Sequence, residues 1–168
     1  GLGALVLSGT NTYEGGTTLV EGSLLAGSDR AFGTGILNLN GGMIGSADGR
    51  RSFTNAVAMA SGGVQFGDAG HLGALSFEGD TTLATGAHTF NTVADTAFNG
   101  ILGGNGASIT KVGDGALTLT NANTYDGGTE IAGGSIRIAN DRALGAGAIT
   151  FNGGALASAN GDSRTIYN

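Results

Sequence analysis

Four side chains that can bind a metal ion lie within 18 residues of one another, at His71, Glu78, Asp80 and His88. Imidazole nitrogens and carboxylate oxygens are common ligands of divalent metals. Their spacing follows no recognisable ligand pattern, however, and each residue lies within two positions of a glycine, as in an exposed turn. We therefore expect four solvated turn residues and no metal site.

Catalytic chemistry has little more support. The sequence contains no Gly-x-Ser-x-Gly elbow, which a serine hydrolase of that type needs. A polysaccharide lyase or hydrolase would gather carboxylates on one strand face, whereas the 13 acidic residues here are dispersed. Residues 103–109 are similar to a calcium-binding glycine repeat, but Ser108 stands where the carboxylate belongs and the unit does not recur. We predict no catalytic, cofactor-binding or metal-binding residue and expect that the chain is not an enzyme.

Two tyrosines, Tyr13 and Tyr125, have aromatic rings that could stack on a sugar. Each follows Asn-Thr and precedes an acidic residue and Gly-Gly-Thr, so the two occupy equivalent places in the chain. This equivalence favours a structural role, in which the ring lies over a glycine turn while the hydroxyl stays in water. The predicted structural repeat motif comprises Asn11, Thr12, Tyr13, Gly15, Gly16 and Thr17, and again Asn123, Thr124, Tyr125, Gly127, Gly128 and Thr129.

The tyrosines belong to a segment that is written twice. Residues 3–49 and 115–161 align without a gap at an offset of 112, and 23 of the 47 positions are identical. Asp29-Arg30 and Asp141-Arg142 recur at one place in the two copies, which predicts a shared loop clasp rather than catalysis. Repeats at a fixed offset indicate an architecture of stacked units. We predict a single segment over residues 1–168, in which residues 50–114 connect the two repeats.

A comparison of the two copies shows which side chains point inward. Leu24-Leu25-Ala26 aligns with Ile136-Arg137-Ile138, and a position that holds Leu or Arg must face outward. This alternation has the period of a strand with one buried face. By the same reasoning we expect Leu19 and Ile131 to be buried and Glu130 to lie in water. In the connecting part the same pattern predicts strands at 53–59, 63–66, 73–77, 81–84, 88–93 and 97–102.

The composition restricts the class of protein. Glycine accounts for 35 of 168 residues and proline and cysteine are absent, yet 40% of the residues are hydrophobic and alternate in register. This pattern disfavours a disordered linker, and no Gly-X-Y period of collagen is present. No helical period and no apolar run near 18 residues occurs. A net charge of −6 with scattered basic residues argues against a nucleic-acid partner.

Short, evenly spaced strands fit an antiparallel sandwich or barrel and also a parallel solenoid. Equivalent corners at equivalent spacing favour the solenoid, because each corner then stacks on the next. With coils of roughly 20 to 25 residues, an offset of 112 residues amounts to about five coils, so the second copy would lie directly above the first. We predict an all-β parallel β-helix of about six to eight coils.

Several motifs also occur in the order found in one bacterial family. The segment beginning Lys111-Val-Gly-Asp-Gly precedes Asn123-Thr-Tyr-Asp-Gly-Gly-Thr and Gly134-Ser-Ile, and Asn11-Thr-Tyr-Glu-Gly-Gly-Thr precedes Gly22-Ser-Leu-Leu. The chain resembles the passenger-associated transport repeat of bacterial autotransporters, the type V secretion proteins. The resemblance covers both copies well, whereas the middle third shares only the pattern of short strands and glycine-rich turns. It implies a right-handed β-helical passenger.

The resemblance also implies a function. We expect a structural stem that supports secretion and folding at the surface of a Gram-negative bacterium, carried across the outer membrane by its own C-terminal β-barrel, which is not in this chain. We further expect surface adhesion or autoaggregation, with host glycans, host proteins or other copies of the chain as partners. The alternative is a non-catalytic stalk that carries an enzyme or toxin domain located elsewhere in the full-length protein.

Overall fold

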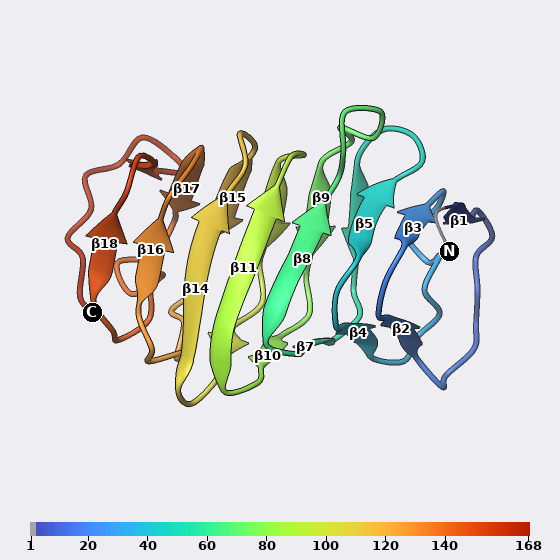
Figure 1. Ribbon diagram of the computed structural model, residues 1–168, viewed down its shortest axis with the longest axis horizontal. Coiled ribbons are helices and arrows are strands. Elements are labelled where there is room, and N and C mark those ends of the chain that lie inside the picture. The colour runs from blue at the N-terminus through green and yellow to red at the C-terminus, as the bar shows by residue number, and fades with distance from the viewer. Residues whose placement is uncertain (1–2) are drawn as a thin grey trace.

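The computed structural model describes residues 3–168, and these form an elongated stack of β-strands in which the first and last strands lie toward opposite ends (Figure 1). The strands make three parallel sheets. Sheet A contains β1 (Ala4–Leu7), β3 (Ser23–Ala26), β5 (Met43–Ser46), β8 (Gly62–Phe66), β11 (Gly86–Thr92), β14 (Ala107–Val112), β16 (Thr129–Ile131) and β18 (Ile149–Phe151).

Sheets B and C complete the three faces. Sheet B contains β2 (Thr17–Leu19), β4 (Leu37–Leu39), β7 (Val57–Met59), β10 (Thr81–Leu83) and β13 (Leu102–Gly103). Sheet C contains β6 (Arg51–Phe53), β9 (Leu75–Phe77), β12 (Thr96–Phe98), β15 (Ala116–Leu119), β17 (Ser135–Ile138) and β19 (Ala155–Ser158). In the middle of the chain each coil passes from sheet A to C to B, so the predicted parallel β-helix is confirmed, with about eight turns.

Side chains at alternate positions fill the interior. Leu24, Ile44 and Phe66 follow one another in register along sheet A and are 4%, 0% and 0% exposed. Leu19 and Ile131 are buried, as predicted, and Glu130 is partly exposed. The core changes in character along the axis: aliphatic side chains dominate the two repeats, whereas six phenylalanines form one contacting cluster, made of Phe32, Phe53, Phe66, Phe77, Phe90 and Phe98.

The prediction that the second repeat lies directly above the first is wrong. The register of sheet A leads from Ala4 through five successive pairings to Val112, so five coils take 108 residues rather than 112. The four residues left over carry the chain around the corner at 113–115, and β15, the equivalent of β1, therefore lies in sheet C. The second repeat is displaced by one whole face of the solenoid.

This displacement separates Leu5 from its equivalent, Leu117. Leu5 begins the inward column of sheet A and is 59% exposed, because β1 is an edge strand with a neighbour on one side only. Leu117 lies in sheet C between β12 and β17 and is fully buried. The strands remain parallel throughout, so the coiling is as predicted and only the angular position of the second repeat differs.

Leu25 faces outward, as predicted, but it is not exposed to solvent. Its equivalent Arg137 is exposed, but Leu25 is only 3% exposed although it points outward. A β-carbon placed on Gly45 would lie 3.0 Å from Leu25 Cδ2 and 3.5 Å from the Cβ of His71. The loop at 67–74, which follows β8, therefore packs over the outer side of sheet A and covers Leu25.

Two of the predicted strands are each divided by a corner of the solenoid. Residues 53–59 contain the end of β6 and all of β7, with Asn55 buried at the corner between them. Residues 97–102 contain most of β12 and the start of β13. In both segments the apolar residues keep alternating across the corner, so the sequence does not indicate the bend. Each segment was therefore predicted as a single strand.

Candidate functional site

The repeat motif forms a corner that holds successive coils together. Asn123 begins the corner in the second copy: its Oδ1 accepts a hydrogen bond of 2.8 Å from the backbone N–H of Leu102, and its Nδ2 donates one of 2.6 Å to the carbonyl of Ala143. One buried side chain thus links three consecutive coils. Asn11 makes the corresponding bond of 2.7 Å to Ala31, so the two copies have the same local geometry.

The tyrosine of each motif lies against a glycine of the next coil. Gly33 and Gly145 have φ values of 66° and 68°, a region that favours glycine. A β-carbon on Gly145 would lie 2.9 Å from two ring carbons of Tyr125, and one on Gly33 would lie 2.7 Å from the ring of Tyr13. Both the backbone conformation and the space under the ring therefore require glycine at these positions.

The tyrosine hydroxyl is not in water in the second copy, contrary to the sequence expectation. Tyr125 is fully buried, and its hydroxyl lies 2.7 Å from Thr129 Oγ1. Thr129 donates its own hydroxyl hydrogen to the carbonyl of Leu144 at 3.2 Å, so Tyr125 is the donor to Thr129. Burial raises the pKa of Tyr125 far above its usual value. Tyr13 makes the same bond to Thr17 but is 40% exposed, because it lies near the first strand.

A third coil closes each corner through an asparagine that the sequence reasoning missed. Asn55 Nδ2 donates to the carbonyls of Gly33 and Gly35 at 3.1 and 2.7 Å. Asn168, the equivalent residue in the second copy, donates to Gly147 at 2.8 Å. The sequence does contain a signal for this pair. Ser52-Phe53-Thr54 is similar to Thr165-Ile166-Tyr167, one residue out of step with the offset of 112, and each of the two segments is followed by the asparagine.

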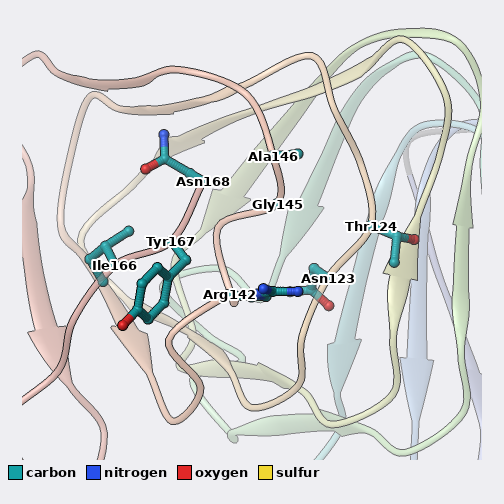
Figure 2. A pocket seen from close by; sticks show the side chains of 8 residues that line it. All are labelled: Asn123, Thr124, Arg142, Gly145, Ala146, Ile166, Tyr167 and Asn168. Atoms are coloured by element: carbon teal, nitrogen blue, oxygen red, sulfur yellow. The ribbon is translucent and has the colours of Figure 1, made fainter.

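A pocket of about 560 Å³ lies between the second corner and the last residues of the chain. Figure 2 shows Arg142, Asn123 and Thr124 on one side and Ile166, Tyr167 and Asn168 on the other. Ile166 aligns in sequence with Phe53 of the first copy, but Ile166 is only partly buried whereas Phe53 is fully buried.

The Asp-Arg dipeptide that recurs in the two copies lies in each corner, but its aspartate and arginine side chains form no ion pair with each other. Asp29 Oδ1 accepts a hydrogen bond of 3.1 Å from the backbone N–H of Ser52, and Asp141 lies 3.6 Å from the guanidinium of Arg164. The arginines contribute through their backbone, since the carbonyls of Arg30 and Arg142 each accept a bond of 3.0 Å from the asparagine that begins the motif. Their guanidinium groups are exposed.

Lys111 is a buried cation at the end of β14. Its side chain points inward between Phe90 and Ile131, and its Nζ donates to the carbonyls of Val112, Gly113 and Gly133 at 2.8, 2.7 and 3.1 Å. Burial lowers its pKa to about 8, against the opposing effect of the charges of Asp114 and Asp95. The ammonium group therefore caps carbonyls of two successive coils at one corner, and no sequence pattern indicated this role.

The four candidate metal ligands are not brought together. His88 is buried inside the solenoid, with Nε2 2.7 Å from the carbonyl of Ala84, whereas Glu78 lies on the outer side of sheet C. His71 pairs with Asp68 at 2.8 Å, and Asp80 accepts a bond from the backbone of Ile101. Over residues 3–168 the structure contains no group of three His, Cys, Asp or Glu side chains that could hold a metal ion. His88 is thus buried, in contrast to the predicted turn residue.

The fold and the corners define a class of protein, a parallel β-helix whose coils are clasped by a repeated Asn-Thr-Tyr motif. The passenger-associated-transport-repeat family matches residues 1–26 and 109–138. The two matches contain both copies of the motif. The chain therefore carries passenger-associated transport repeats, as the resemblance in its sequence predicted.

A curated relative supports the same assignment. The chain is 38% identical over 137 residues to the Adhesin BmaC autotransporter of Brucella suis biovar 1 (strain 1330). The aligned part is 80% of this chain but only 4% of that protein, so the chain spans a small part of its relative's length. No solved structure matches the chain. Within residues 3–168 the structure has no helix with the length and apolar character needed to span a membrane.

Proposed function

We propose that the chain is a rigid, non-catalytic stem segment of an autotransporter passenger that contributes to adhesion at the surface of a Gram-negative bacterium. The observation that carries the proposal is the pair of transport-repeat corners, each of which fastens three coils of one continuous β-helix. A solenoid whose neighbouring coils are hydrogen-bonded strand to strand holds its outer faces at fixed spacing, which suits weak contacts repeated along a surface. The relative is itself named an adhesin and an autotransporter.

The proposal has two further parts, a partner and a role in secretion. The full-length protein would carry its own C-terminal outer-membrane β-barrel, and folding of the coils outside the cell would support secretion. Because coils contact only their neighbours, folding can spread from one coil to the next. Each transport-repeat corner would then fix a newly added coil through Tyr125 or Tyr13 and its glycine partner.

Adhesion is tested by displaying the chain on bacteria through an unrelated carrier. Attachment to cultured cells and aggregation of the bacteria are measured per displayed molecule, against the carrier alone. We expect an increase in at least one of the two. Values equal to the carrier alone, with the chain displayed and folded, would contradict the adhesive role and favour a stalk for an enzyme or toxin domain.

The secretion role needs a separate measurement in the full-length protein. Gly145→Ala disturbs one corner and should reduce the amount of passenger at the cell surface while total synthesis stays constant. Gly15→Ala is a matched control, because Gly15 has no neighbour near its missing β-carbon and no positive φ. Equal surface amounts for both variants and the wild type would contradict a role of the corner in secretion.

A further inference from the structure

The outer face of sheet C carries a trough of about 260 Å³ that spans several coils. In register, Ser76, Ala97, Thr118 and Arg137 follow one another on β9, β12, β15 and β17, and all four point away from the core. The methyl group of Ala97 is the smallest side chain in this row, so the face is hollowed there. Asn99 and Asp95 line the two sides of the hollow.

The polar groups of the trough are held in fixed positions. Ser76 Oγ donates to Glu78 Oε1 at 2.6 Å, and Asn99 Nδ2 lies 3.0 Å from both Ser76 Oγ and Glu78 Oε2. These hydrogen bonds, that of Ser76 above all, lower the pKa of the Glu78 carboxyl, which is therefore ionised at neutral pH. A row of oriented hydroxyl and amide groups can bind the hydroxyls of a sugar without first becoming ordered.

Two arginines lie at the ends of the trough. Arg50 precedes β6 and Arg137 lies on β17, four strand spacings away, or about 19 Å along the axis. Both are exposed, and over residues 3–168 neither guanidinium forms an ion pair or a side-chain hydrogen bond. A guanidinium binds a carboxylate through two parallel hydrogen bonds, so each end of the trough is suited to an anionic group.

Two carboxylates between the arginines limit the kinds of anionic ligand that the trough can bind. The exposed carboxylate of Asp95 lies in the trough, and Glu78 lies beside it. A nucleic acid, with a phosphate at every step, would place negative charges against both carboxylates. A chain of sugars with carboxylates only at intervals avoids this repulsion, while its hydroxyls can donate to Asp95.

We propose that the sheet C trough binds a linear glycan with carboxylate-bearing sugars, which contact Arg50 and Arg137 while Ser76, Asn99, Asp95 and Thr118 bind hydroxyls between them. The inference rests on the proposed adhesive function and names its ligand. Shape and charge act together in this site: the hollow at Ala97 admits the sugar chain, and the arginines select its charge.

The test uses the 168-residue chain and a short oligomer in which glucuronic acid alternates with the neutral sugar N-acetylglucosamine, with the carboxyl-reduced oligomer as the neutral probe. Calorimetric titration should detect binding of the acidic oligomer, weakened at least tenfold in the double variant Arg50→Gln/Arg137→Gln. Arg142→Gln is the matched control, since it removes the charge of an exposed arginine at a different pocket and should leave affinity unchanged. Ala97→Tyr should abolish binding by filling the hollow. Circular dichroism confirms that each variant is folded.

In the titration, three results would overturn the inference: no binding of the acidic oligomer, equal binding of the neutral oligomer, or equal losses for Arg142→Gln and the double variant. Cell attachment distinguishes this failure from failure of the proposed function. If bacteria that display the double variant attach as well as those with the wild type, the adhesive surface lies elsewhere and the assignment of the trough is wrong. If the wild type itself does not attach, the adhesive function is wrong.

Discussion

Gly145 lies under the ring of Tyr125, and the two residues come from successive coils of the second repeat. The carbonyl of Tyr125 also accepts a hydrogen bond of 3.0 Å from the N–H of Ala146, so ring and backbone both hold the glycine in place. The same contact joins Tyr13 to Gly33. The relationship explains why the glycine of Asp-Arg-Ala-x-Gly recurs with the tyrosine of Asn-Thr-Tyr, although the two are 20 residues apart.

Substitution of Gly145 by Ala should destabilise the fold by more than the cost of its positive φ alone. A non-glycine residue in this region costs about 1–2 kcal/mol, and the new methyl group would also collide with the ring and the carbonyl of Tyr125. Gly161→Ala isolates the first effect, because Gly161 has a φ of 78° and open space around it. In thermal unfolding, the midpoint temperature of Gly145→Ala should lie well below that of Gly161→Ala. Equal midpoints would show that the ring contact carries no energy.

Removal of the buried hydroxyl in Tyr125→Phe should lower the free energy of unfolding by about 1–2 kcal/mol, the usual cost of a lost buried hydrogen bond. Tyr13→Phe is the matched variant: it removes the same bond at a site that is 40% exposed, where water replaces the partner. Chemical denaturation of both variants measures the difference. A loss in Tyr13→Phe as large as that in Tyr125→Phe would argue against burial as the cause.

The sequence predicted the strands, the inward faces and the coiling because these depend on local alternation, which the two copies made visible. It did not predict the displacement of the second repeat by one face, because that depends on the sum of coil lengths. The pairing of Ala4 with Ser23 closes one coil in 19 residues, whereas the pairing of Gln65 with Asn91 needs 26. The longer coil contains the loop at 67–74. The sequence of a polar, glycine-rich loop does not show how many of its residues lie outside the regular coil, so the length of that coil could not be predicted.

The sequence identified the corner residues as a motif but did not predict how far each of them is buried. Tyr125 loses its contact with water because it lies between two coils: the preceding coil is bonded to it through Thr124 and Leu102, and the following coil through Ala146. Tyr13 is bonded in the same way to the following coil but lies at the first strand, so it stays partly exposed. Lys111 was missed for a similar reason. A lysine in an alternating strand is normally an outward residue, and only the carbonyls of Val112, Gly113 and Gly133, gathered at one corner, allow it to point inward.

The pKa of Lys111 predicts how stability depends on pH. Its folded-state value of about 8 lies below the ordinary value of 10.5, so between these values the unfolded chain binds more protons. The free energy of unfolding should therefore rise from pH 8 toward pH 10.5, by at most about 3 kcal/mol. Above about pH 10 the raised pKa of Tyr125 acts in the opposite direction, because that residue then ionises only in the unfolded chain.

Denaturation between pH 7 and pH 10 checks this prediction, with Lys111→Met as the reference. The variant cannot titrate, so its stability should lack the rise above pH 8 even though it loses the cap on three carbonyls. An unchanged rise in the variant would assign the pH dependence to another group.

The phenylalanine cluster should make the connecting part, which lacks the repeat motif, the most sensitive to truncation of the core. Phe77 is fully buried and contacts Phe53, Phe66 and Phe98, with ring centroids 5.4, 6.0 and 4.8 Å away. Phe77→Ala should cost about 3–5 kcal/mol through the lost burial and the cavity that remains. Phe151→Ala should change stability by less than about 0.5 kcal/mol, since Phe151 is 58% exposed on the edge strand β18.

Thermal unfolding measures both variants, and a similar small effect for the two would mean that the cluster adds nothing beyond an aliphatic core. The large difference that we expect would place the strongest packing between the repeats, where the transport-repeat corners are absent, so that corner bonds and aromatic packing stabilise different coils of one solenoid.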